Sequence, residues 1–273
     1  MISHNIDRKT ISKRIKSSIY LIIFTILAII FRPIFLVVSL FLILESLWEF
    51  FGMIEKKGAR LFKPFGLVLG AIIPVSIAVS FPLTAEWQFM IILVSLFLLF
   101  LFELTKKKNQ EVVLSIAATL FGVMYISWCF SFTIRIRNLP QGVYLLSFLV
   151  LVVKAQDIGA YLIGNAFGRR ALLKRVSPHK SVEGAIGGVA SAVISALIFS
   201  RLLPSLSLGH ALILGFVLSI IGQLGDLFES LIKRDCGVKD SGKIIAGMGG
   251  TLDVIDSLLF ASPVFYLYLT MIR

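Results

Sequence analysis

The stretch Leu208-Gly-His-Ala-Leu-Ile-Leu-Gly-Phe-Val-Leu-Ser-Ile-Ile-Gly-Gln-Leu-Gly-Asp-Leu-Phe228 decides the fold class of this chain. A run of about 20 mostly apolar residues is long enough for a helix to cross the hydrocarbon core of a bilayer. Its acidic residue, Asp226, comes close to the end of the run. A charged group in a membrane helix usually faces an aqueous cavity or a partner. The stretch therefore predicts a membrane-spanning helix with a polar group at one end.

Similar apolar runs fill most of the remaining chain. They cover residues 17–31, 34–54, 65–83, 86–104, 111–134, 143–163, 184–203 and 251–272. Composition agrees, because 58% of the residues are hydrophobic and 15% are charged, against about 45–50% and 25% in soluble domains. The sequence predicts an all-α, polytopic integral membrane protein with about nine transmembrane helices.

Lysine and arginine concentrate in alternate connecting segments, starting with the N-terminal segment. The positive-inside rule then predicts a cytoplasmic N-terminus. The formal net charge of +12 is explained by these loops, so we expect no nucleic-acid partner.

The two halves of the chain differ in the polarity of their loops. We expect residues 1–140 to form about five transmembrane helices that serve as a scaffold and supply oligomer contacts. Residues 141–273 are expected to form about four helices. Their cytoplasmic loops, 164–183 and 231–250, are rich in Gly, Ser, Lys, Arg and Asp and are predicted to build the catalytic site.

Three pairs of charged residues, each spaced by three positions, lie in this second half: Lys154 with Asp157, Asp226 with Glu229, and Asp253 with Asp256. This spacing places both members of a pair on one face of a helix, about one turn apart. The predicted topology brings all three pairs toward the cytoplasmic surface. Glu45, Glu49 and Glu103 do not belong to these three pairs, and we expect them to have interfacial or packing roles.

Clustered carboxylates favour a hard cation such as Mg²⁺, which commonly also binds substrate phosphates. Basic residues that could donate to phosphate oxygens follow in the same loops: Arg175, Lys180, Lys233, Arg234 and Lys239. Carboxylates, a divalent cation and a basic rim are the parts needed for phosphoryl or nucleotidyl transfer.

The segment Ser177–Ser181 precedes another of the apolar runs. Pro178 is expected to form a turn there, and the following helix N-terminus could present its N–H groups to an anion. Gly184, Gly187 and Gly188 suit either close helix packing or the approach of a phosphate.

Several segments resemble the CTP:phosphatidate cytidylyltransferase family, also called CDP-diglyceride synthases. They are Asp157-Ile-Gly-Ala-Tyr161, Ser177-Pro-His-Lys-Ser-Val-Glu-Gly184, Gly225-Asp-Leu-Phe-Glu229, Ser230-Leu-Ile-Lys-Arg234, Lys239-Asp-Ser-Gly-Lys-Ile-Ile245, and the Gly249-Gly250, Asp253 and Asp256 that follow. The family pattern departs at four positions, where Pro, His, an aliphatic residue and Arg are expected. Here these positions are Ala246, Met248, Thr251 and Val254, and the departures predict reduced activity.

The resemblance implies that the protein makes CDP-diacylglycerol and pyrophosphate from CTP and phosphatidic acid. It implies Mg²⁺ as cofactor, K⁺ as a second cation, membrane lipid as surroundings and a homodimer. The expected metal ligands are Asp226, Asp253, Asp256 and Asp157. Among these, Asp226, Asp253 and Asp256 are also the expected catalytic residues, with Lys233 and Lys239. Expected substrate contacts are Lys180, Ser177, Arg234, Asp240 and Ser230. The expected location is a bacterial-type cytoplasmic membrane, with phosphatidic acid arriving from the inner leaflet and the site facing the cytoplasm.

Two other functions fit the same features. One is a CTP-dependent lipid-alcohol kinase, which would also combine membrane helices with basic loops. The other is an ion-coupled transporter that uses the intramembrane acids as its cation site.

Overall fold

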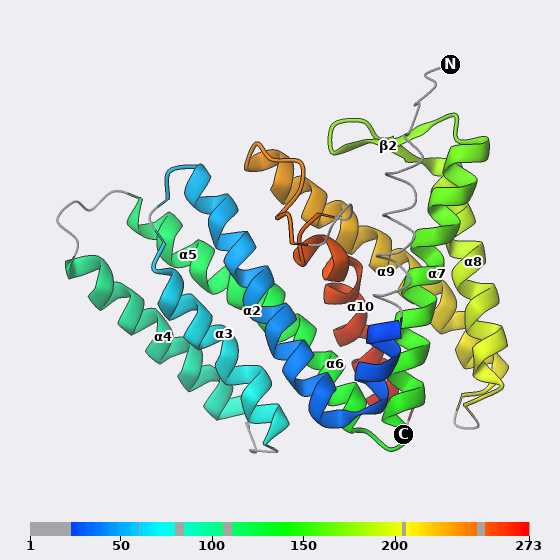
Figure 1. The fold of residues 1–273 in the computed structure, drawn as a ribbon, viewed down its shortest axis with the longest axis horizontal. Helices are drawn as coiled ribbons and strands as arrows, with labels where there is room; N and C mark the ends of the chain where they lie inside the picture. Colours follow the sequence, from blue (N-terminus) through cyan, green and yellow to red (C-terminus); the bar gives the residue numbers. More distant parts are fainter. Residues whose placement is uncertain are drawn as a thin grey trace.

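The computed structural model describes residues 23–59, 61–79, 85–105, 111–203, 206–244 and 249–272. They form a helical bundle with one small hairpin (Figure 1). The elements are α2 (Arg32–Lys56), α3 (Lys63–Ala78), α4 (Ala85–Thr105), α5 (Val112–Gly122), the π-helix η1 (Val123–Trp128), α6 (Cys129–Asn138), α7 (Gly142–Phe167), β1 (Ala171–Leu173), β2 (Ser177–Ser181), α8 (Val182–Ser200), α9 (Leu208–Asp235) and α10 (Leu252–Met271).

The prediction of an all-α membrane protein is confirmed. Within the described residues, six helices are long and apolar enough to span a bilayer, with α5, η1 and α6 forming one continuous span. Two shorter apolar helices lie at Lys63–Ala78 and Phe89–Thr105. Each predicted run from 34–54 onward corresponds to one of these helices. The run 17–31 lies partly outside the described residues, so the count of nine stays a prediction.

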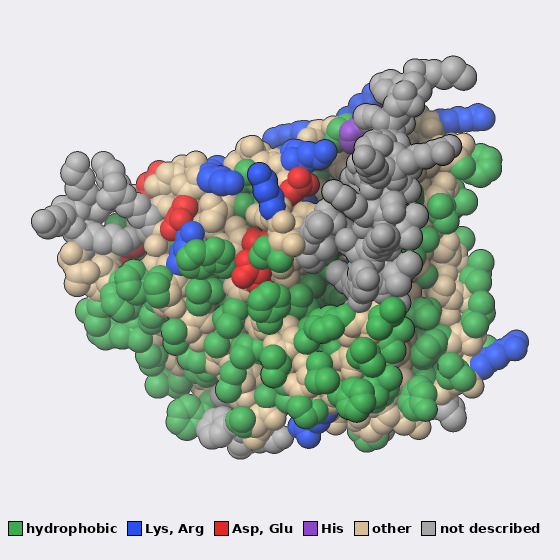
Figure 2. All heavy atoms as spheres, viewed as in Figure 1, with side chains coloured by type: hydrophobic (Ala, Val, Ile, Leu, Met, Phe, Trp, Pro, Cys, Tyr) green, Lys and Arg blue, Asp and Glu red, His purple; other side chains and the backbone are tan. Residues whose placement is uncertain are grey.

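The surface of the bundle suits a lipid environment. Hydrophobic side chains cover most of the face seen in Figure 2, while charged side chains gather mainly along its upper edge. Val113, Val37 and Ile198 are exposed by 81%, 70% and 67%. Isolated exposed apolar residues are ordinary in soluble proteins, but a continuous apolar band indicates a membrane or protein partner.

Polar connections gather at one end of the bundle, which we call the polar end. The loop from α2 to α3, the β1–β2 hairpin and the segment from α9 to α10 all lie there (Figure 1). The C-terminal end of α10 lies at the opposite end. The polar end therefore carries the loops that were predicted to hold the catalytic site.

Small residues let α7 and α8 pack closely. A Cβ added to Gly159 would lie 2.1 Å from the Ser191 hydroxyl, and one on Gly187 would lie 2.5 Å from the Ile163 side chain. A Cβ on Gly188 would approach the carbonyl oxygen of Gln156 to 2.9 Å. The structure thus favours helix packing as the role of Gly187 and Gly188, one of the two roles expected for them.

The expected loop 164–183 contains an antiparallel hairpin of β1 and β2. The prediction of a turn at Pro178 is wrong, because this residue lies within β2. A two-stranded hairpin has open edges, where the missing N–H of proline is tolerated. The Ser181 hydroxyl then caps α8 by accepting a hydrogen bond from the Gly184 amide, with 3.1 Å between O and N.

Helix α9 is longer than predicted, since it continues to Asp235 rather than ending near residue 228. Its last turns therefore carry Asp226, Glu229 and Lys233 as helical residues. Gly237 has a φ of +68° just beyond the helix, a conformation that glycine adopts at low energy and that commonly ends helices. Between α9 and α10 the structure describes residues 236–244 and 249–251.

Candidate active site

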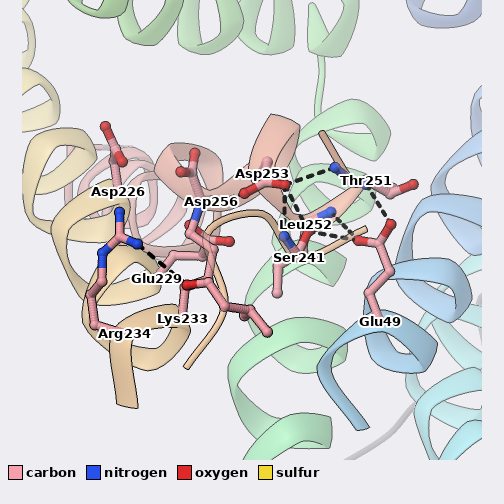
Figure 3. Close-up of polar contacts among 12 residues, drawn as sticks. Glu49, Asp226, Glu229, Lys233, Arg234, Ser241, Thr251, Leu252, Asp253 and Asp256 are labelled. Carbon is pink, nitrogen blue, oxygen red and sulfur yellow. Dashed lines mark hydrogen bonds and ion pairs between the residues drawn. The ribbon is translucent and has the colours of Figure 1, made fainter. Parts of the chain in front are cut away.

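Three carboxylates from three helices meet near the polar end. We call Asp157 of α7, Asp226 of α9 and Asp256 of α10 the acidic trio. The Ser257 hydroxyl lies 3.0 Å from an Asp256 carboxylate oxygen and 3.4 Å from one of Asp157, so these two acids flank a single hydroxyl group. The carboxyl groups of Asp226 and Asp256 extend in the same direction (Figure 3).

Gly225 explains why α9 can approach α10 so closely at this level. A Cβ at this position would lie 2.8 Å from the carbonyl oxygen of Asp256. The two helix backbones are thus in direct contact one residue before Asp226. Only a glycine permits this contact without a shift of either helix.

Two lysines accompany the acidic trio. The Lys154 ammonium lies 2.9 Å from a carboxylate oxygen of Asp157 and donates a second hydrogen bond to the Val254 carbonyl at 3.1 Å. Lys180, on β2, forms an ion pair with Asp226. The side chains of Lys180 and Asp226 are each 31% exposed, so this pair remains open to a ligand.

A second charged cluster lies beside the trio. Lys233 pairs with both Glu229 and Asp253, and all three side chains are largely buried. The other Asp253 carboxylate oxygen accepts hydrogen bonds from the Ser241 amide, the Ser241 hydroxyl and the Gly250 amide, at 3.0, 2.9 and 2.7 Å. Asp253 thus fixes Ser241 and Gly250 against the start of α10.

Glu49 completes this second cluster from the other half of the chain (Figure 3). It lies near the end of α2, is 6% exposed, and accepts hydrogen bonds from the Ser241 hydroxyl at 3.0 Å and from the amides of Thr251 and Leu252 at 2.9 Å each. The first N–H groups of a helix have no partner within the helix, so Glu49 acts as a distant cap of α10. The sequence-based reading of Glu49 missed these partners; its one signal was an acid at the inner end of an apolar helix.

The predicted substrate contacts fall around the same end. The Arg234 guanidinium donates to the carbonyl oxygens of Val176 and Val238 at 3.3 and 3.4 Å, which ties the end of α9 to the hairpin. Ser177 lies half-buried on β2, Ser230 is buried on α9, and Lys239 and Asp240 are exposed beyond α9.

The structure describes two of the four positions that depart from the family pattern. Ala246 and Met248 lie outside the described residues. Thr251 and Val254 are described, and both act through their backbones: Thr251 donates its amide to Glu49, and Val254 accepts from Lys154.

The acidic trio has the donor chemistry expected of a magnesium site. Among the described residues, no three His, Cys, Asp or Glu side chains are arranged to hold one ion by themselves. Mg²⁺ is usually bound by only one or two carboxylates, with waters and substrate phosphates completing its shell. Asp226 and Asp256 fit that requirement, with Asp157 next to them. Asp253 differs, because both of its oxygens are already bound within the protein.

A bundle of apolar helices with carboxylates and lysines collected at one end defines a polytopic membrane protein with a charged site near its surface. Comparison with known proteins then identifies the family. Residues 12–272 match the model of the Cytidylyltransferase family, and the chain belongs to that family. The resemblance seen in the sequence motifs is thereby confirmed.

Several known proteins are similar in sequence to about half of this chain. The chain is 42% identical over 151 residues to the uncharacterized protein YnbB of Escherichia coli, an alignment that covers 55% of this chain and 50% of that protein. It is 42% identical over 153 residues to the phosphatidate cytidylyltransferase of Bacillus subtilis, covering 55% and 56% of the two chains. It is 48% identical over 134 residues to the phosphatidate cytidylyltransferase of Haemophilus influenzae, an alignment that covers 47% of this chain and 46% of that protein. The alignments thus span about half the length of each relative.

Proposed function

We propose that this protein is a phosphatidate cytidylyltransferase, which forms CDP-diacylglycerol and pyrophosphate from CTP and phosphatidic acid. The observation that carries the proposal is the acidic trio: three helices of a cytidylyltransferase-family protein carry Asp157, Asp226 and Asp256 near one end of the bundle, where Lys154 pairs with Asp157 and Lys180 pairs with Asp226. The names of the Bacillus and Haemophilus relatives support the same substrates.

The acidic trio is the proposed site for Mg²⁺, held by Asp226 and Asp256 with Asp157 as a further ligand or support. When bound, the ion would neutralise phosphate charge and help to orient the nucleotide. Asp253 stays a predicted ligand, although its contacts favour a role in holding the 236–251 segment.

Lysine and arginine side chains supply the phosphate contacts in this proposal. Lys180 pairs with Asp226, and a phosphate of CTP would offer it a charge-assisted alternative. Arg234 and Lys239 lie on the rim with exposed side chains. Ser177, Ser230 and Asp240 stay predicted substrate contacts, and of these Ser230 is buried. Lys233 is buried between Glu229 and Asp253, so we assign it mainly to ordering the site.

The reaction needs only positioning and charge neutralisation. An oxygen of the phosphatidic acid phosphate attacks the α-phosphorus of CTP. The bond from that phosphorus to the bridging oxygen of the β-phosphate breaks, and pyrophosphate leaves with the electron pair. Positive charge fixed around the phosphates stabilises this transfer, and no covalent enzyme intermediate is required.

The membrane arrangement in this proposal follows the charge distribution. We propose nine spans with a cytoplasmic N-terminus, in a bacterial-type cytoplasmic membrane. The polar end then faces the cytoplasm, where CTP arrives, and phosphatidic acid enters from the inner leaflet. A homodimer stays an expectation of the resemblance.

The decisive experiment supplies purified full-length protein in lipid nanodiscs with phosphatidic acid, Mg²⁺ and CTP labelled at either the α- or the γ-phosphate. The expected result is α-label in the lipid product and release of pyrophosphate. Asp226→Asn should lower the rate by roughly 100-fold, since charge at the reacting phosphates is commonly worth that much. Asp235→Asn, on the exposed end of the same helix, is the matched control and should retain activity.

Other outcomes would replace the proposal. Transfer of the γ-label to a lipid alcohol would identify a kinase. Solute uptake into liposomes without consumption of CTP would identify a transporter.

A further inference from the structure

Lys154 occupies an unusual position for a lysine, because it lies in the interior of α7, a membrane-spanning helix. A cation within a membrane helix is costly unless it has partners. Here it has them: the Asp157 carboxylate at 2.9 Å and the Val254 carbonyl at 3.1 Å. These contacts join α7 to α10 at the level of the acidic trio.

The two lysines pair with different acids of the acidic trio. Asp256 has no ion-pair partner among the described residues. Lys154 pairs with Asp157, and Lys180 pairs with Asp226.

The two lysines differ in how firmly they are held. Lys180 extends from a short hairpin and makes one ion pair, with Asp226. Lys154 is bound to two groups on two membrane helices. The bond to the Val254 carbonyl on α10 thus fixes the Lys154 ammonium more firmly at the level of the acidic trio.

The second contact of Lys154 is the backbone carbonyl of Val254. Val254 lies where the family pattern has an arginine between the two aspartates of α10. In this chain the cation beside that backbone position comes from α7 instead, through the bond from Lys154 to the Val254 carbonyl. Lys154 thus places a positive charge beside the backbone of Val254.

Resting on the proposed function, we propose that the Lys154 ammonium is a built-in monovalent cation of this site and takes the place of the K⁺ that the family resemblance implies. An ammonium and K⁺ carry the same charge, and both accept carboxylate and carbonyl oxygens as neighbours. Asp157 and the Val254 carbonyl are such oxygens, and Lys154 already fills the space between them. The protein therefore needs a divalent cation with its nucleotide but no added monovalent cation.

The test compares wild type with Lys154→Ala in chloride salts of K⁺, methylammonium or the bulky N-methylglucamine, at equal ionic strength. Two readouts are taken: the thermal unfolding midpoint without nucleotide or divalent cation, and cytidylyl transfer with saturating Mg²⁺. Wild type should be indifferent to the monovalent cation in both. Lys154→Ala should lose roughly 100-fold in rate in N-methylglucamine and recover at least tenfold in K⁺ or methylammonium. Its unfolding midpoint should rise in the same two salts.

Controls separate this inference from its alternatives. Lys57→Ala removes an exposed lysine that is also paired with an aspartate, Asp235, and should respond to no particular cation. Lys154→Arg keeps the charge and should remain indifferent to K⁺, which tests the idea even if Lys154→Ala fails to fold. A wild type that requires K⁺, or a Lys154→Ala protein that no small cation rescues, would overturn the inference. A wild type that is inactive in every salt would refute the proposed function instead, and the unfolding midpoints would still decide the role of Lys154.

Discussion

The Glu49 carboxylate on α2 accepts a hydrogen bond from the backbone amide of Thr251 at the start of α10, with 2.9 Å between oxygen and nitrogen. The two residues are 202 positions apart in the chain. Because the same carboxylate also binds Leu252 and Ser241, one side chain of the N-terminal half sets the position of the 236–251 segment.

Glu49→Ala should therefore destabilise the protein and the segment together. The substitution leaves buried donors without a partner, which costs about 2–3 kcal/mol in stability. We expect a lower unfolding midpoint and faster proteolysis within residues 236–251. Glu55→Ala is the matched control on the same helix, since the Glu55 side chain is 37% exposed and pairs with Lys63. Equal effects of the two substitutions would remove Glu49 from this role.

Lys233→Met should be among the most damaging single substitutions of a charged residue. It leaves the Glu229 and Asp253 carboxylates, which are 0% and 10% exposed, without their shared cation. Loss of one partner from a buried ion pair costs about 3–5 kcal/mol. Chemical or thermal unfolding in detergent measures the loss. Lys57→Met, which breaks an exposed pair with Asp235, should leave the midpoint nearly unchanged, and an equally large drop there would contradict this account.

Asp256→Asn and Asp253→Asn should fail in different ways. Asp256 belongs to the acidic trio, so its substitution should raise the Mg²⁺ concentration for half-maximal activity by at least about tenfold with little change in stability. Asp253 binds Lys233, Ser241 and Gly250, so its substitution should lower the unfolding midpoint and the maximal rate. Mg²⁺ titrations combined with thermal unfolding separate the two. If Asp253→Asn also shifts the Mg²⁺ requirement, Asp253 is a metal ligand as first predicted.

Gly225→Ala should separate α9 from α10. The added Cβ meets a backbone oxygen of Asp256 at 2.8 Å, which cannot move as a side chain could, and such overpacking costs about 1–3 kcal/mol. The shift should also move Asp226 away from Asp256 and lower activity more than stability. Gly209→Ala is the control on the same helix, because its nearest contact would be a comfortable 3.8 Å from the Ser207 hydroxyl. Comparable activity in both variants would show that the helix contact does not position the acids.

The helices were predictable because a membrane imposes length and apolarity on every span. Runs such as 143–163 and 251–272 match α7 and α10 closely. The end of α9 was missed because its last turns carry charged residues, which resemble a loop in sequence. Lys233 is buried there only because Glu229 and Asp253 surround it. The hairpin was missed since β1 and β2 are short and have no apolar alternation.

The site was predictable in part for a similar reason. Spacing of three places both members of each pair on one helical face, and the charge of the loops indicates which helix ends share one side of the membrane, so the position of Asp226 and Asp256 near the same end of the bundle could be expected. The partners of Asp253 and Glu49 depend on how a loop folds back across the bundle. Ser241, for example, is a polar residue in a polar segment and carries no sign that two carboxylates share its hydroxyl.

The hydrogen bonds from the start of α10 to Glu49 join the two halves of the chain. They limit which N-terminal halves can be exchanged between related proteins. The first 140 residues show no motif of their own, so exchanging them for another set of apolar helices would look harmless. A chimera built that way would lack the one acid that reaches the start of α10, unless the incoming half carried a carboxylate at the same height as Glu49. A working hybrid would have to inherit that single residue.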